Sequence, residues 1–221
     1  MDYILCIETS TTNCSVAVAK GSEIVNLEED YNTTYSHAEQ LHNFIDKVVK
    51  EAGLSLKDLS AVAVSMGPGS YTGLRIGVSA AKGLCYALDI PLIAISTLQS
   101  LALQVEDQDE NYVIPMIDAR RMEVYSAVFS SDSNKQVRET KAEILTDTSF
   151  LPFLTDKKVY FIGNGVDKYT TICTYSDAVF ITNKLPSAKE MGVLSYAKFL
   201  NKDFEDVGYF EPYYLKDFVA G

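Results

Sequence analysis

The chain alternates short apolar runs with longer amphipathic segments, an order typical of an α/β protein. Apolar runs rich in β-branched residues predict strands at residues 3–7, 14–19, 23–29, 61–65, 91–95, 112–118, 123–130, 137–145, 159–162 and 178–181. Apolar positions at helical spacing predict helices at residues 36–52, 72–88, 97–105 and 187–201, with weaker helical segments at 55–59 and 147–154. The polar stretch 31–35 is expected to be a loop.

Helix start signals accompany two of these segments. Ser36 with Glu39, and Ser187 with Glu190, have the spacing of capping boxes, in which each side chain bonds the other residue's backbone N–H. These pairs predict where the first and the last of these helices begin.

The most distinctive stretch of the sequence joins a strand, a Gly67-Pro68-Gly69 turn and the helix at 72–88. Ser70 and Thr72 are the candidate N-caps of this helix. Backbone N–H groups at such a helix start hold an anion in some proteins, whereas in others the glycines simply allow close packing. The sequence leaves both readings open.

The helix at 72–88 carries two apolar stripes where an ordinary surface helix has one. One stripe is aliphatic and the other contains small residues, whereas Arg75 and Lys82 belong to a third, polar stripe. Two apolar stripes indicate burial on two sides. The second side packs either against the chain's own neighbouring helix or against another protein.

Composition narrows the classes of function. The 221 residues include 19 basic and 30 acidic side chains, a net charge of −11 that disfavours direct binding of nucleic acid. No apolar stretch is long enough to span a membrane, so we expect a cytoplasmic protein. The four cysteines lack metal-site spacing and are expected to be buried thiols. His37 and His42 are five residues apart, which does not suit a metal pair on one helix face, so no metal site is expected.

Candidate chemistry is sparse. The Glu8-Thr9-Ser10 turn after the first strand would suit a phosphate loop, but it contains no glycine. Ser70 has no general base placed by sequence. Asp118 ends a strand as a possible catalytic carboxylate, although pairing with Arg120 or Arg121 is the simpler expectation.

The acidic stretch 106–111 is the candidate domain boundary. It divides the chain into lobes at residues 1–105 and 106–221, and we expect the last helix and the tail to pack back on the first lobe. The strand and helix order of the first lobe recurs in weakened form in the second, which indicates two related α/β lobes.

Four segments in this order resemble the bacterial TsaB family: Ile7-Glu8-Thr9-Ser10, the stretch from Gly67 to Gly77, Ile117-Asp118-Ala119-Arg120 with Glu123-Val124-Tyr125, and Pro212-Tyr213-Tyr214-Leu215-Lys216. The resemblance implies an actin-like (ASKHA, ribonuclease-H-like) α/β fold of two lobes, each a mixed sheet flanked by helices, the second reduced. It also implies a non-catalytic subunit for making threonylcarbamoyladenosine beside the tRNA anticodon.

The partners that the resemblance implies are a TsaD-like transferase, in a heterodimer, and a TsaE-like ATPase. No cofactor is expected to bind tightly, and ATP or ADP would lie at the joint surface of the complex; tRNA would be contacted only indirectly. The transferase carries two metal-binding histidines at positions matched here by Thr97 and Leu101, which cannot replace imidazoles. The alternative is a nucleotide-dependent ASKHA enzyme or a glycoprotease-like metallopeptidase.

In the family, the first two helices form the partner interface. The matching candidates here, for a transferase or for a second copy of the chain, are His37, Leu41, Ile45, Leu74, Arg75, Gly77, Val78, Ala81, Lys82 and Cys85. The candidates for a residual nucleotide or anion loop are Glu8, Thr9, Ser10, Gly67 and Gly69. No catalytic residue is predicted.

Overall fold

The structure is a computed structural model that describes residues 2–31, 36–107, 109–154 and 157–216. Most of the predicted loop at 31–35 therefore lies outside the described residues. The chain divides into two compact units, Met1–Thr97 with Pro186–Gly221, and Leu98–Leu185. This division corrects the boundary expected at residues 105 and 106, and the last helix and the tail do belong to the first unit, as expected.

The first unit contains a five-stranded sheet in the order β3-β2-β1-β4-β5. Strands β1 to β3 are antiparallel neighbours, and β4 and β5 are parallel to β1. The strands are β1 (Tyr3–Glu8), β2 (Cys14–Lys20), β3 (Glu23–Asp30), β4 (Ala61–Gly67) and β5 (Leu92–Ser96). The helices are α1 (His37–Glu51), the 3-10 turn η1 (Leu56–Asp58), α2 (Tyr71–Leu88) and α5 (Ala188–Leu200).

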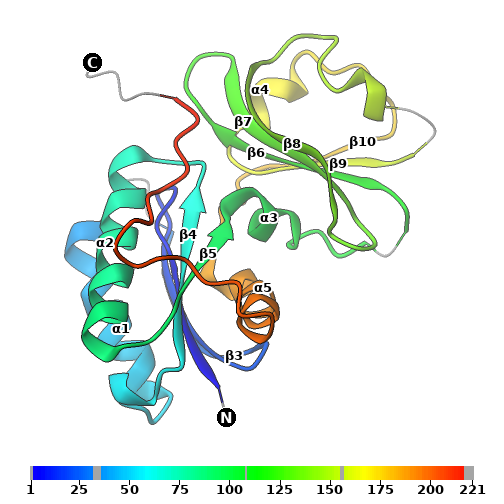
Figure 1. The fold of residues 1–221 in the computed structure, drawn as a ribbon. Coiled ribbons are helices and arrows are strands. Elements are labelled where there is room, and N and C mark those ends of the chain that lie inside the picture. Colours follow the sequence, from blue (N-terminus) through cyan, green and yellow to red (C-terminus); the bar gives the residue numbers. More distant parts are fainter. Residues whose placement is uncertain (1, 32–35, 108, 155–156, 217–221) are drawn as a thin grey trace. The chain divides into compact units, whose positions relative to one another are not determined.

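Helices cover both faces of this sheet (Figure 1). Alternate strand residues such as Leu5 and Val64 pack against α1 and α2, while the intervening Cys6 and Ala63 face α5. The alternation follows from the two-residue period of a strand, and burial on both faces explains why the strands read as continuous apolar runs.

The second unit repeats the same strand order in its own sheet, β10-β9-β6-β7-β8. The antiparallel strands are β6 (Tyr112–Asp118), β7 (Glu123–Ser130) and β8 (Gln136–Ile144), and β9 (Val159–Ile162) and β10 (Ala178–Ile181) run parallel to β6. Its helical segments are short: α3 (Thr97–Ala102, starting at the last residue of the first unit), η2 (Leu151–Phe153) and α4 (Asp167–Thr170). The repeated topology confirms an actin-like α/β fold with a reduced second lobe.

The two capping boxes predicted from the sequence have different outcomes in the structure. The Ser187 side chain accepts a hydrogen bond from the Lys189 N–H, so this serine caps α5 as predicted. The capping box predicted at Ser36 and Glu39 is wrong, because the Ser36 hydroxyl donates to Asp30 at 2.9 Å and makes no cap hydrogen bond. The competing carboxylate belongs to Asp30 at the end of β3, which lies outside the four-residue pattern that predicts a capping box.

Candidate functional site

Helix α2 starts directly from the glycine turn. The Ser70 side chain accepts a hydrogen bond from the Gly73 N–H at 3.2 Å, which confirms Ser70 as the N-cap, whereas Thr72 lies inside the first turn. At the other end, Asp89 adopts a left-handed conformation with φ of 55° and closes the helix.

The glycines of this region serve close packing. A Cβ atom at Gly69 or Gly73 would come within 3.0 Å of the carbonyl oxygen of Ser10 or Thr9, respectively, closer than Cβ atoms essentially ever come. At Gly77 it would meet the Thr9 hydroxyl in the same way. Hydrogen bonds hold the two segments together, since the Ser70 N–H donates to the Ser10 carbonyl at 2.6 Å and the Thr9 hydroxyl donates to the Gly73 carbonyl at 2.8 Å.

The Glu8-Thr9-Ser10 turn is buried and its amide groups are already bonded. The Thr9 N–H donates to Ser65 Oγ at 3.3 Å, and the Ser10 N–H donates to Glu8 Oε1 at 2.6 Å. Burial raises the pKa of the Glu8 carboxyl, and its Oε2 has no hydrogen-bond partner within the described residues. The N–H groups of Thr9 and Ser10 are therefore not free to hold an anion.

The predicted anion loop is therefore closed in this structure. Glu8, Thr9 and Ser10 are at most 1% exposed, and Gly69 closes onto the Ser10 carbonyl. At Gly67, where φ is 111°, the space next to the α-carbon is taken by the carbonyl oxygen of Tyr213. Of the two readings of the glycine turn, the structure supports close packing.

Most of the predicted partner-interface residues lie in the core of the first unit, which corrects their assignment. The side chains of α1 and α2 that face the sheet are 4% exposed or less: Leu41, Ile45, Leu74, Val78, Ala81 and Cys85. Gly77 is buried against Thr9, and His37 is buried with its Nε2 bonded to the Thr11 carbonyl at 2.7 Å. Because the sheet takes the aliphatic stripe, these residues are not available to a partner.

The opposite face of α2 forms an open groove with α1. Its volume is about 670 Å³, and it is lined by His42 of α1 and by Tyr71, Thr72, Arg75, Ile76, Ser79, Ala80, Gly83 and Leu84 of α2. The half-buried Ile76, Ala80 and Leu84 follow one another at a spacing of four residues. A Cβ atom at Gly83 would meet nothing within 4 Å. An apolar, small-residue strip with polar neighbours has the chemistry of a helix-binding surface.

Sequence reasoning missed most of this groove. Only Arg75 is shared between the predicted interface and the groove lining. The signal was present in the small-residue stripe, which contains Ala80 and Leu84. Spacing alone does not say which of two apolar stripes a sheet will cover.

The two predicted interface cations are both engaged by the C-terminal tail. Lys82 Nζ donates to the carbonyl oxygens of Gly208 and Phe210 at 3.2 and 3.0 Å. Arg75 Nε donates to the Tyr214 hydroxyl at 3.2 Å, and the guanidinium lies 4.2 Å from the centre of the Tyr71 ring. Arg75 remains exposed at the groove, whereas the Lys82 ammonium is directed to the tail.

In the second unit, Asp118 pairs with a different cation from those expected. Its Oδ1 accepts hydrogen bonds from Lys168 Nζ at 2.8 Å and from the backbone N–H of Arg120 at 2.6 Å. Lys168 also donates to the Glu123 carbonyl at 3.0 Å. These contacts tie the β6–β7 hairpin to α4, so the structural reading of Asp118 holds, with Lys168 in place of an arginine side chain.

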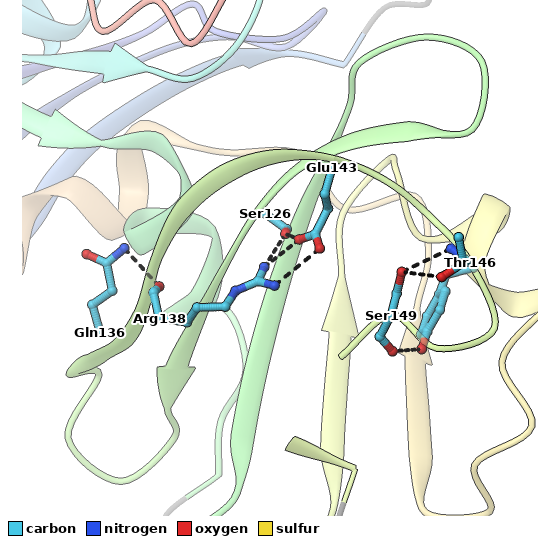
Figure 2. Close-up of polar contacts among 7 residues, drawn as sticks. Ser126, Gln136, Arg138, Glu143, Thr146 and Ser149 are labelled. Atoms are coloured by element: carbon cyan, nitrogen blue, oxygen red, sulfur yellow. Dashed lines mark hydrogen bonds and ion pairs between the residues drawn. The ribbon is translucent and has the colours of Figure 1, made fainter. Parts of the chain in front are cut away.

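A second polar cluster joins β7 to β8 (Figure 2). Arg138 lies 2.5 Å from Glu143 and also donates to the Ser126 hydroxyl at 2.6 Å, and that hydroxyl donates to Glu143. The guanidinium also lies 4.8 Å from the centre of the Phe150 ring. Both terminal nitrogens of the guanidinium are bonded to neighbours on the same sheet, so the cluster acts as a structural tie.

Neither metal ligands nor a membrane span emerge from the described part of the chain. Within residues 2–31, 36–107, 109–154 and 157–216, no three His, Cys, Asp or Glu side chains gather as a metal site. No helix among them is long and apolar enough to cross a membrane. Cys6, Cys14 and Cys85 are buried free thiols as expected, whereas Cys173 is only partly buried. Burial raises the pKa of Cys6 and of Cys14 to about 12.

The chain is similar to known proteins in sequence and in structure. Residues 32–221 match the family model of TsaD, tRNA N6-adenosine threonylcarbamoyltransferase. The chain is 31% identical to the tRNA threonylcarbamoyladenosine biosynthesis protein TsaB of Haemophilus influenzae, over 98% of this chain and 94% of that protein. It is 30% identical to TsaB of Escherichia coli, over 98% and 96%. The solved structure of YeaZ from Pseudomonas aeruginosa has a TM-score of 0.83 and 26% identity, covering 97% of this chain and all of that one.

Proposed function

The chain belongs to the TsaB family, and on that premise we propose that it is a non-catalytic subunit in tRNA threonylcarbamoyladenosine biosynthesis. Its role in this proposal is to bind a TsaD-type transferase through the groove between α1 and α2. The groove is the single observation that carries the proposal, because its apolar residues on the first unit are only half-buried by the chain's own core.

The family model that matches the chain is that of the transferase. The chemistry of the residues therefore has to distinguish a transferase from a subunit that assists it. The positions that resemble the transferase's metal-binding histidines are Thr97 and Leu101, and both are fully buried. Leu101 packs in the hydrophobic core of the second unit. A buried hydroxyl and an aliphatic side chain do not make a transition-metal site, which supports a subunit that assists the transferase.

The groove suits a partner helix. Ala80 and Gly83 leave room for a backbone to approach, while Ile76 and Leu84 supply apolar contact. Arg75 adds a positive charge in a chain whose net charge is −11, and such a charge contributes more to specificity than to affinity. A helix with an acidic residue opposite Arg75 is the occupant that this lining favours. In the absence of the transferase, a second copy of the chain is the competing occupant.

We further propose that nucleotide binds only at the joint surface with the transferase, where a TsaE-type ATPase also acts. The closed Glu8-Thr9-Ser10 turn supports this, because it leaves no room for a phosphate on the isolated chain. The acidic net charge supports indirect contact with tRNA, made through the partner. The machinery is proposed to work in the cytoplasm.

Co-expression with the cognate TsaD-type transferase tests the proposal. Gel filtration is expected to give a stable complex, and adding the TsaE-type ATPase, ATP and tRNA is expected to give modified tRNA. Ala80→Glu places a charge in the groove and is expected to abolish the complex. Ala197→Glu, on the exposed face of α5, is the matched control and is expected to bind as the wild type.

Failure of the wild-type chain to form any complex, with or without ATP, would refute the proposal. Light scattering of the isolated chain over a range of concentrations measures the competing homodimer, which Ala80→Glu is also expected to dissociate. The enzyme alternatives make different predictions: stoichiometric metal, or micromolar ATP binding with turnover, in the isolated chain. Metal analysis and calorimetric titration with ATP distinguish them.

A further inference from the structure

The C-terminal tail lies along the first unit after α5. The Glu205 N–H donates to the Leu92 carbonyl at 2.9 Å, and the Tyr213 N–H donates to the Met66 carbonyl at 2.7 Å. Between these points Val207 and Phe210 pack against the core that α2 shares with the sheet. In Figure 1 this segment, red, passes beside α2. The tail is therefore attached at both ends of its path.

Near the end of its described part, the tail contacts residues of the groove but does not line the groove. The Tyr214 ring lies 4.9 Å from the Tyr71 ring, centre to centre, and its hydroxyl accepts the Arg75 Nε–H at 3.2 Å. Arg75 in turn lies over the Tyr71 ring at 4.2 Å. Tyr71 and Arg75 both line the groove, whereas Tyr214 does not. Tyr214 of the tail thus contacts two side chains of the groove without lining the groove itself.

A further contact holds the tail at Lys82, nearer the C-terminal end of α2. Lys82 Nζ bonds the carbonyl oxygens of Gly208 and Phe210, so the helix holds the middle of the tail as well as its end. Gly67 completes the arrangement, because only a residue without a Cβ leaves space for the Tyr213 carbonyl. Three separate contacts fix the position from which Tyr214 reaches Arg75.

We propose that Tyr214 is a positioning residue for partner binding, which presets Tyr71 and Arg75 at one end of the groove. This inference rests on the proposed function and names a determinant of that same site. A long arginine side chain is costly to order on binding, and a hydrogen bond that orders it beforehand reduces that cost. A residue outside the groove therefore sets affinity for the acidic helix that the groove binds.

The test measures affinity for the cognate TsaD-type transferase by calorimetry. Tyr214→Phe removes only the hydroxyl that bonds Arg75, and we expect the dissociation constant to rise about threefold to tenfold. Tyr213→Phe removes the neighbouring hydroxyl, for which no hydrogen bond is found among the described residues, and is expected to bind as the wild type. The thermal midpoints of both variants are expected to match the wild type.

A double-mutant cycle separates positioning from a general structural role. If Tyr214 acts through Arg75, then Tyr214→Phe has no further effect in an Arg75→Gln background. A measurement without the partner adds to this: the Arg75 Nε–H resonance is expected to exchange faster with solvent in Tyr214→Phe than in the wild type.

Two results would overturn the inference while leaving the proposed function intact. One is a wild-type dissociation constant for Tyr214→Phe. The other is an undiminished effect of Tyr214→Phe in the Arg75→Gln background. A wild-type chain that fails to bind the transferase would instead refute the proposed function, and this inference with it.

Discussion

Two glycines of the same helix should respond in opposite directions to the same substitution. Replacing a helical glycine by alanine ordinarily stabilises a protein by about 0.5–1 kcal/mol, because glycine loses more conformational freedom on folding. Gly83 faces open space, so Gly83→Ala should realise this gain. Gly77 faces the Thr9 hydroxyl, and there the new methyl has no room.

The size of the Gly77→Ala effect follows from what must move. Overpacking a well-packed site costs about 1–3 kcal/mol. Displacing the Thr9 side chain also weakens its hydrogen bond to the Gly73 carbonyl, a loss of about 1 kcal/mol. After the intrinsic gain of the alanine is subtracted, Gly77→Ala should lower the free energy of unfolding by about 1–3 kcal/mol.

Urea unfolding followed by circular dichroism compares the two variants with the wild type. We expect the midpoint to fall for Gly77→Ala and to rise for Gly83→Ala, with the slope of the transition unchanged. Thermal midpoints should differ in the same order, by about 2–4 °C for each kcal/mol. Equal stability of the two variants would refute the close packing of α2 on the turn after β1.

Four further predictions concern the buried groups and the tail. Because burial raises the Glu8 pKa, its stabilising contribution is present below the ordinary value near 4.5 and is lost as pH rises through the folded value. Glu8→Gln should therefore gain stability relative to the wild type as pH rises, in urea titrations across neutral pH; a constant difference would contradict this. The pKa of His37 is lowered by burial, so its contribution is lost as pH falls below about 6.5, and the wild type should lose more stability than His37→Asn on acidification. Leu74→Asp buries a charge and should prevent folding rather than only partner binding, as circular dichroism of the purified variant would show. Lys82→Met should speed hydrogen exchange at residues 205–214, and unchanged exchange would show that Lys82 does not hold the tail.

The sequence predicted the strands well because their apolar runs are short and bounded by turn residues. It also predicted that the last helix packs back on the first lobe, as α5 does. Helix α5 returns to the first unit, where Gly192 lies close to Ile24 and Ser22. The boundary expected at residues 105 and 106 instead falls after Thr97, because Leu98, Leu101 and Ala102 of α3 pack in the core of the second unit.

The sequence predicted the correct helix for the candidate site, α2, but not the correct face of that helix. Both stripes of α2 are apolar, and the sheet covers the one with Leu74 and Val78. The groove takes the stripe with Ala80 and Leu84. Similarly, the glycine turn resembled an anion loop because the same residues that admit a phosphate also admit a neighbouring backbone. Only the position of Thr9 and Ser10 distinguishes the two.

The central claim is that the groove between α1 and α2 binds the transferase, and two substitutions at Gly83 test it most directly. A Cβ atom at Gly83 would meet nothing within 4 Å, so we expect the folded chain to tolerate substitution at this position. Calorimetric titration of the TsaD-type transferase is expected to show that Gly83→Ala still binds. The side chain of Gly83→Trp fills the groove, and this variant is expected to bind at least a hundredfold more weakly, a difference of about 2.7 kcal/mol. Wild-type affinity in Gly83→Trp would contradict the account.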